Sequence, residues 1–128
     1  MKNNNYLIFQ LGDTHYALNT DNVQSILGLC KISKIPKSPP FVEGFINFRD
    51  RTLMIIDIKK ILKINDKNQN NNIIVLNDFG ILIDSVKSVI EMKEGDILKL
   101  PMGNDHLIGT VEIDDKLILI LDVKNILI

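Results

Sequence analysis

The sequence repeats itself at an interval of 65 residues, and this repeat limits what the chain can fold into. Segments 44–63 and 109–128 read GFINFRDRTLMIIDIKKILK and GTVEIDDKLILILDVKNILI, with seven of 20 positions identical. Composition alone gives roughly one or two identities over this length, and most other positions exchange one apolar residue for another. The chain is therefore two copies of one small unit, with little sequence left for an active site. The identical pairs are Gly44/Gly109, Asp50/Asp115, Ile55/Ile120, Asp57/Asp122, Lys59/Lys124, Ile61/Ile126 and Leu62/Leu127.

Shorter matches extend the repeat over the rest of the chain. The same interval pairs Ile35-Pro36 with Leu100-Pro101, and segment 16–18 with segment 81–83. An asparagine-rich stretch over 65–72 falls where the two copies join. Because a half-chain alone would bury little surface, we predict a single domain with mutually packed halves, approximately 1–65 and 66–128.

Alternating apolar patterns predict that the structure is mainly β. Hairpins are expected over 6–18, 45–56, 73–83 and 107–121, and further strands over 31–35 and 98–100. Each half then has about five short strands. Five antiparallel strands close most economically as a small barrel, since closure removes exposed edges.

Short helices are expected between some of these strands. Capping oxygens over 19–21 precede Val23, Ile26 and Leu27, whose spacing is helical, and Val86 and Val89 repeat part of this pattern. Asp57 and Asp122 each follow a strand and can cap a short helix.

Composition excludes several classes of partner. A net charge of −1 argues against nucleic acid, because phosphate binding needs an excess of Lys and Arg. The single Cys30 excludes an intrachain disulfide and is typical of a reducing cytoplasm. Apolar runs are far below the ~20 residues that span a bilayer, so we expect neither direct membrane insertion nor a signal peptide.

The residues that usually perform catalysis do not form a recognisable set. His15 and His106 stand apart from any cluster at metal-ligand spacing, the serines lack a G-x-S-x-G motif, and the glycines are scattered singly. Asp57 and Asp122 could form a symmetric acid pair, but two equivalent helix caps explain them more simply. We therefore predict no enzyme activity, no catalytic residue, no cofactor and no metal.

Arginine is used sparingly, and both arginines lie in one turn. The chain has 15 Lys and Arg residues in total, of which only Arg49 and Arg51 are arginine. Where lysine is the usual cation, an arginine indicates a need for a planar donor with several N–H groups. The alternative, two solvated turn residues, stays open.

One stretch of the first half runs from Ile35-Pro36 through FVEGFINFR at 41–49 to Ile55-Ile56-Asp57. It resembles the CheW family of chemotaxis coupling proteins, whose pattern is a proline loop, F-[IV]-x-G-[VI]-[IV]-N-L-R-G and an apolar strand ending in Asp. Segment 81–89, ILIDSVKSV, resembles the family's G-[FI]-x-V-D-x-V-x-x-V segment. Asp50 departs from the pattern by replacing a glycine, which predicts a turn less able to adopt positive φ.

The resemblance implies two pseudo-symmetric five-stranded barrels of SH3 type in one CheW-like domain. It also implies a cytoplasmic adaptor that performs no chemistry and joins membrane receptor arrays through its partners. Those partners would be the regulatory domain of a CheA-type histidine kinase and the cytoplasmic tip of methyl-accepting chemoreceptors. Two alternatives stay open: a CheW-like module in another circuit, such as surface motility, and a small enzyme or ligand carrier with a cleft between the barrels.

The resemblance also implies binding residues. The receptor tip would lie in a groove between the barrels, with walls formed by Val23, Ile26, Val86 and Val89. Helical spacing alone is equally compatible with packing of these four side chains in the core. The kinase would contact the outer face of the first barrel near Ser25, Ile32 and Thr52. The expected receptor-binding residues are Thr20, Val23, Ile26, Arg49, Val86 and Val89.

Overall fold

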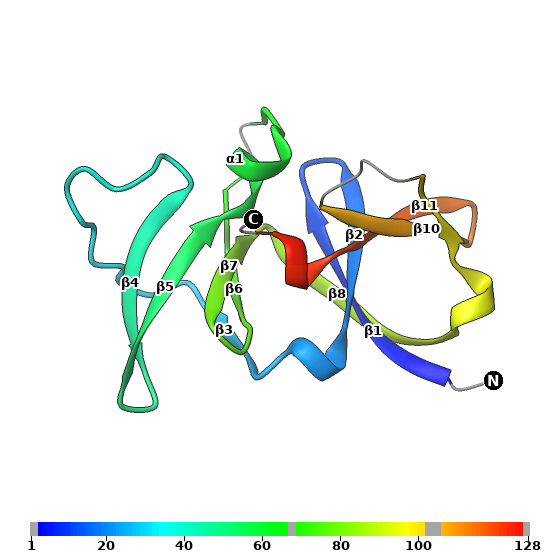
Figure 1. Ribbon diagram of the computed structural model, residues 1–128, viewed down its shortest axis with the longest axis horizontal. Coiled ribbons are helices and arrows are strands. Elements are labelled where there is room, and N and C mark those ends of the chain that lie inside the picture. Colours follow the sequence, from blue (N-terminus) through cyan, green and yellow to red (C-terminus); the bar gives the residue numbers. More distant parts are fainter. Residues whose placement is uncertain (1–2, 67–68, 102–105, 127–128) are drawn as a thin grey trace. The chain divides into compact units, whose positions relative to one another are not determined.

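The structure is a computed structural model that describes residues 3–66, 69–101 and 106–126 (Figure 1). Strands predominate, which confirms the mainly β class. The described residues form two compact units, each with one sheet. Unit 1 comprises residues 3–22, 86–101 and 106–126, and unit 2 comprises Val23–Ser85.

Unit 2 has a five-stranded sheet whose central strand is fully buried. All five residues of β7 are buried, because a neighbouring strand lies on each side and apolar side chains cover both faces. Its core includes Leu53, Ile55 and Ile73, which are at most 1% exposed. Fully burying such a side chain stabilises the fold by about 1.5–3 kcal/mol. The strand order is β3 (Ser25–Gly28), β6 (Asn72–Val75), β7 (Phe79–Ile83), β5 (Arg51–Asp57) and β4 (Val42–Phe48).

Unit 1 has the same arrangement with one more strand. Its core includes Ile8, Ala17, Met92 and Ile120, which come from both ends of the chain. Two short 3-10 helices, η1 (Thr20–Asn22) and η3 (Val123–Asn125), follow strands, and a third, η2 (Glu94–Asp96), precedes the last strand of the order. That order is β8 (Ser85–Lys93), β1 (Asn3–Leu11), β2 (Thr14–Asn19), β11 (Lys116–Leu121), β10 (Leu107–Ile113) and β9 (Leu98–Lys99).

In each unit, the segment that follows the first strand of the sheet order pairs with a strand at the other end of the sheet and so closes it. In unit 1 this segment reaches the opposite edge as β9, where Leu98 pairs with Thr110 of β10. In unit 2 the corresponding bridge joins Ser33 to Phe45 of β4. The two bridges are 65 residues apart on both strands, so the repeat determines how each sheet curls back on itself.

The hairpin registers follow the same interval. In the β4–β5 hairpin, Val42 pairs with Ile56 and Gly44 with Ile55, with a bulge between the two pairs. In the β10–β11 hairpin, Leu107 pairs with Leu121 and Gly109 with Ile120, with a bulge at the equivalent place. The parallel pairings do not keep this interval. Ile55 lies opposite Gly80 and Ile120 lies opposite Ala17, which is two residues beyond the position 65 residues before Gly80. In both units a small residue therefore faces the buried isoleucine.

The compact units do not follow the expected boundary between 1–65 and 66–128. Strand β5 pairs in parallel with β7, and β11 pairs in parallel with β2, so the first hairpin of each repeat joins the sheet of the other repeat. A boundary drawn through the asparagine-rich join would leave both sheets incomplete. Sequence similarity locates the repeats, but strand pairing decides which segments fold together.

The helix predicted across Val23, Ile26 and Leu27 is wrong, and so is the helical spacing assigned to Val86 and Val89. In the first region the 3-10 helix η1 ends at Asn22 and the strand β3 follows it, and Val86 and Val89 lie on β8. In β3, Leu27 packs towards the unit 2 core while Ile26 is 43% exposed, a strand alternation. Pairing of β3 with β6 supplies backbone hydrogen bonds that outweigh a short helical pattern.

Other local expectations are confirmed in part. Segment 31–35 contains only the isolated bridge at Ser33 rather than a strand. Asp57 caps α1 (Ile58–Leu62) by accepting a hydrogen bond from the Lys59 backbone N–H at 3.2 Å. Asp122 does not cap in this way, because its carboxylate instead accepts from Asn125 Nδ2 at 2.7 Å.

Substitution of Gly44 tests the closure of unit 2. A Cβ atom at Gly44, whose φ is 150°, would lie 2.3 Å from the Ser33 carbonyl oxygen, whereas nothing lies within 4 Å of a Cβ at Gly28. We expect Gly44→Ala to lower the free energy of unfolding by about 2–3 kcal/mol, since the Ser33 bridge must shift. Gly28→Ala should change it by about 0.5 kcal/mol or less. Denaturant unfolding measures both, and equal losses would contradict the role of the bridge.

Candidate interaction surfaces

No group of three or more His, Cys, Asp or Glu side chains that could hold a metal ion is found among the residues that the structure describes. His15 lies on β2, where partial burial, followed by the charges of Lys116 and Lys87, lowers its pKa. None of the described helices is long and apolar enough to cross a membrane.

The residues expected to bind a receptor are divided between the two units. Thr20, Val86 and Val89 belong to unit 1, and Val23, Ile26 and Arg49 belong to unit 2. The exposed fractions are 59% for Val89 and 43% for Ile26, while Val23 and Val86 are half-buried. In unit 1, β1 separates β8 from β2, after which Thr20 begins η1. Two of the four apolar residues are therefore not core residues of their units.

Strand alternation explains why Ile26 and Val89 stay exposed. On β3, Leu27 packs towards the core and its neighbour Ile26 points outward. On β8, Ile90 and Met92 join the unit 1 core and Val89 points outward. Both strands are first in the order of their sheets. Exposed apolar side chains on edge strands are candidates for contact with another protein.

The residues expected to bind a kinase all lie in unit 2 but differ in environment. Thr52 is exposed on β5 and lines a depression of about 310 Å³ with Lys31, Ser33 and Asn47. Ile32 packs partly against the unit 2 core, and Ser25 pairs with Val75 in the sheet. The structure thus brings Thr52 together with the neighbours of Ile32, while Ser25 does not line this depression.

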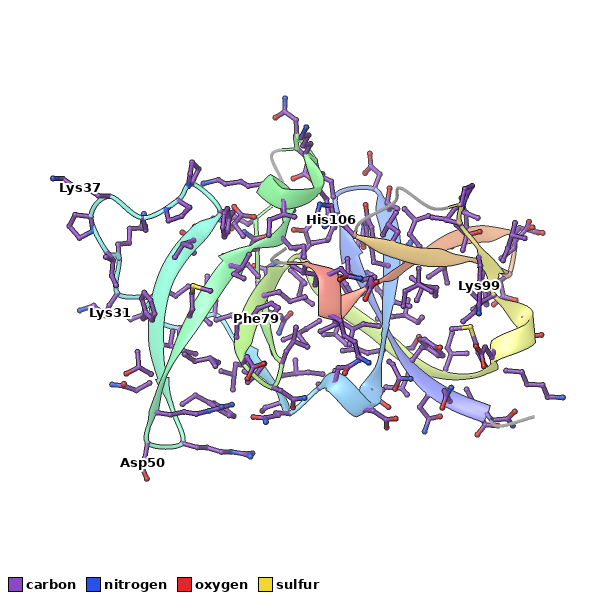
Figure 2. All side chains as sticks on the ribbon, in the orientation of Figure 1. Lys31, Lys37, Asp50, Phe79, Lys99 and His106 are labelled. Atoms are coloured by element: carbon purple, nitrogen blue, oxygen red, sulfur yellow. The ribbon has the colours of Figure 1, made fainter. Side chains whose placement is uncertain are left out.

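The turn that carries Arg49 is a two-residue hairpin turn with positive φ at both positions. The φ angles are 49° at Arg49 and 64° at Asp50, so the expectation that Asp50 hinders such a conformation is wrong. Asp adopts the left-handed region more readily than most residues, and this turn type matches the twist of the flanking strands. Figure 2 shows Asp50 at the tip of the β4–β5 hairpin, with its side chain directed away from the ribbon.

The side chain of Arg49 is exposed and stacks on its own hairpin. Its guanidinium carbon lies 4.9 Å from the centroid of the Phe48 ring. A cation–π contact at an exposed site contributes about 0.5–1 kcal/mol. The contact orders the guanidinium while most of its donors remain available to a partner.

Sequence reasoning missed the hydrogen bonds of Arg51. Its Nη1 donates to the Asn77 carbonyl oxygen at 3.0 Å, and its Nη2 donates to Gln24 Oε1 at 2.7 Å. Gln24 Nε2 in turn donates to Asn77 Oδ1 at 3.3 Å. The scarcity of arginine was the available signal, whereas Gln24 and Asn77 carry none. The sequence left two interpretations of the arginines, a planar donor or a solvated turn residue, and Arg51 fits the first.

A buried ionic cluster surrounds Lys59 of α1. Its Nζ forms an ion pair with Asp66 at 2.9 Å and a second with Asp84, and both Lys59 and Asp84 are buried. Burial lowers the pKa of Lys59, but the hydrogen bonds and charges of Asp66 and Asp84 outweigh it, so the pKa is raised. A lysine held protonated cannot act as a base or nucleophile at neutral pH. The cluster is structural, joining α1, the chain after it and the end of β7.

The chain thus forms two small β units with exposed apolar side chains on their edge strands. These features are typical of the class of protein that binds other proteins through its surface. A family model described as the CheW-like domain matches residues 5–128. The chain belongs to the CheW family, whose members are scaffold or adaptor proteins of chemotaxis.

Individual relatives agree with this assignment. The chain is 32% identical to the chemotaxis protein CheW of Thermotoga maritima over 130 residues, which cover 94% of this chain and 85% of the relative. It is 24% identical to the protein FrzA of Myxococcus xanthus, over 84% of this chain and 73% of the relative. Among solved structures, the scaffolding protein TtCheW of Thermoanaerobacter tengcongensis matches with a TM-score of 0.88 and 28% identity, covering 96% of this chain and 86% of that one. The match confirms the SH3-like barrel fold implied by the sequence resemblance.

The charge on Lys59 should contribute to stability in a defined pH range. Because the folded-state pKa is raised, the contribution is fully present below the ordinary value of 10.5 and is lost as pH rises through the folded-state value. Lys59→Met should lower the free energy of unfolding by about 3–5 kcal/mol at neutral pH, since it removes this partner from buried Asp84. Exposed Lys60 provides a control, with an expected change of about 0.5 kcal/mol or less for Lys60→Met.

Denaturant unfolding across pH measures both effects. Wild-type stability should fall more steeply than that of Lys59→Met above pH 10.5. Parallel curves, or equal losses for Lys59→Met and Lys60→Met at neutral pH, would show that the cluster does not stabilise the fold.

Proposed function

We propose that this chain is a non-enzymatic adaptor that couples chemoreceptors to a CheA-type histidine kinase. The family match over residues 5–128 carries the proposal. The partners are the cytoplasmic tip of methyl-accepting chemoreceptors and the regulatory domain of the kinase. The adaptor acts in the cytoplasm and reaches membrane receptor arrays only through these partners.

The proposed receptor surface is the set Thr20, Val23, Ile26, Arg49, Val86 and Val89. A receptor tip is a helical hairpin, and a helix binds through apolar anchors along one face. The exposure of Ile26 and Val89 supports this assignment, because these side chains are available without unfolding either unit. Arg49 adds a guanidinium for a polar contact with the receptor.

The proposed kinase surface is the outer face of unit 2 around Ser25, Ile32 and Thr52. Exposed Thr52 and the depression beside it support contact there, with Lys31 supplying a positive charge. Ile32 and Ser25 belong to the same proposed surface, with Ser25 on β3 and outside this depression.

A second candidate is a CheW-like module that serves another signalling circuit, such as one for surface motility. The match to FrzA favours keeping it, since this relative does not carry the chemotaxis name. Both candidates use the same fold and differ only in the identity of the receptor and kinase.

Reconstitution tests the proposal directly. The purified chain is mixed with a soluble receptor-tip fragment and with the kinase regulatory domain, both from the same genome, and each affinity is measured by calorimetry. Autophosphorylation of the full kinase is then measured with receptor-containing membranes, with and without the chain. Binding of both partners and receptor-dependent kinase activity are expected. Failure to bind either partner would refute the proposal, and binding only to partners from another circuit would favour the second candidate.

Charge introduced at the exposed anchors should weaken receptor binding without unfolding the protein. Val89→Lys and Ile26→Lys each place an unpaired charge against an apolar helix and should weaken receptor binding about ten- to a thousandfold. Because both side chains are already exposed, the melting temperature should change little. Leu117, which is 59% exposed but outside the proposed surface, provides the control Leu117→Lys. Equal effects of all three variants on receptor affinity would refute the surface.

Arg49 should serve binding rather than stability. Arg49→Ala removes an exposed cation–π contact, so stability should fall by at most about 1 kcal/mol. Receptor affinity should fall about five- to thirtyfold, since interface arginines are frequent hot spots. Thermal denaturation and calorimetry separate the two effects, with Lys60→Ala as the control for a lost positive charge. Unfolding with unchanged affinity of the folded fraction would make Arg49 a structural residue.

A further inference from the structure

Arg51 joins three segments of unit 2 that are distant in sequence. Its guanidinium donates to Gln24 Oε1 at 2.7 Å and to the Asn77 carbonyl oxygen at 3.0 Å, over 27 and 26 residues. Gln24 Nε2 completes the ring by donating to Asn77 Oδ1 at 3.3 Å. The chain before β3, the β4–β5 turn and the β6–β7 turn are thereby tied together at one end of the unit.

The ring connects two parts of the proposed receptor surface. Gln24 lies next to Val23, and its backbone N–H donates to the Val75 carbonyl oxygen at 2.8 Å, which fixes it to β6. Arg51 directly follows the Arg49–Asp50 turn. A ring from Gln24 to Arg51 therefore sets the position of the Arg49 backbone relative to Val23.

The fold itself does not require this ring, as the other unit demonstrates. The equivalent turn, Asp114–Asp115, has φ angles of 50° and 65°, nearly those of the Arg49–Asp50 turn. At the interval of 65 residues, Val89 and Lys116 replace Gln24 and Arg51. A valine side chain has no acceptor, and an ammonium group lacks the planar fork that reaches two acceptors at once. The same backbone turn thus forms without the ring, which points to a role at the surface of unit 2.

We propose that Arg51 is a positioning residue for receptor binding. Through Gln24 and Asn77 it holds the turn that bears Arg49 against the start of β3, so that Arg49, Val23 and Ile26 meet the receptor as one preorganised surface. Arg51 itself does not contact the receptor. The inference rests on the proposed function, because Arg49 is a receptor contact only in that function.

The proposal predicts coupled effects of Arg51 and Gln24 on binding. Arg51→Ala and Gln24→Ala should each weaken binding of the receptor-tip fragment about three- to tenfold, with the double variant no weaker than the worse single one. Arg51→Lys should restore only part of the affinity, because lysine reaches one acceptor in place of two. Lys116→Ala, the equivalent change in unit 1, should leave affinity unchanged.

A readout without receptor tests the mechanism separately. Amide NMR signals of residues 24, 49, 50 and 77 should shift together in Arg51→Ala and in Gln24→Ala, while those of the unit 1 turn stay in place. Amide exchange at Arg49 and Asp50 should become faster in the same variants. If Arg51→Ala unfolds the chain, Gln24→Ala provides the same test with Arg51 present.

The outcomes distinguish this inference from the proposed function. If Arg51→Ala binds normally while Arg49→Ala binds weakly, the positioning role falls and the adaptor function stands. If Arg51→Ala weakens binding but Gln24→Ala does not, Arg51 contacts the receptor directly and the positioning role falls. If wild-type protein does not bind the receptor-tip fragment, the proposed function fails and this inference fails with it.

Discussion

The parallel pairings of β5 with β7 and of β11 with β2 determine the organisation of the whole chain. Each pairing joins strands from different repeats, so each sheet needs both halves of the sequence. In the first pairing Ile55 lies opposite Gly80, where a Cβ atom would lie 2.8 Å from Ile55 Cδ1, so the isoleucine side chain fills the space beside the glycine. The β4–β5 and β10–β11 hairpins and the closing bridges at Ser33 and Leu98 join segments that are close together in the sequence. A chain built in this way gains stability from long-range contacts, which form only after large loops have closed.

The repeats have kept their backbone and diverged in their side chains. The β4–β5 and β10–β11 hairpins share register, bulge and turn angles. Their turns carry different charges, Arg49–Asp50 in one unit and Asp114–Asp115 in the other. An adaptor must bind unlike partners, and a duplicated scaffold with different surfaces meets that need without new folds. The hydrogen-bonded ring around Arg51 is part of this divergence, because it fixes the Arg49–Asp50 turn of unit 2. Unit 1 has Val89 and Lys116 in place of Gln24 and Arg51.

The sequence predicted the hairpins well because their signals are local. Alternating apolar residues and short turns identified β1–β2, β4–β5, β6–β7 and β10–β11, and the cap at Asp57 followed from its position. It failed at β3 and β8, where a few apolar residues fit helical and strand spacing alike and sheet pairing decided the outcome. The boundary of the units failed for a related reason, since parallel pairing between repeats leaves no mark in the order of residues.

The candidate site was less predictable than the fold, because binding residues are defined by exposure and by partners. Spacing alone left Ile26 and Val89 divided between core and surface, and strand alternation resolved them as exposed. The ring of Gln24, Arg51 and Asn77 depends on three segments meeting, which no pattern within one segment encodes. Residue type gave a partial signal, since arginine among many lysines indicates a donor of defined shape.

The residues that form the core and the residues proposed to bind partners are different in this protein. The central strands of unit 2 bury Ile73, Ile74 and Ile81 completely. Truncating any one of them to alanine would lower the free energy of unfolding by about 2–5 kcal/mol. The exposed positions on β3, β8 and the β4–β5 turn contribute little to this core, so they can change with small effects on folding. An adaptor can therefore vary its contact residues to match its partners while the two β units persist. The same separation explains how a solved relative that is only 28% identical to this chain keeps the same fold, with a TM-score of 0.88.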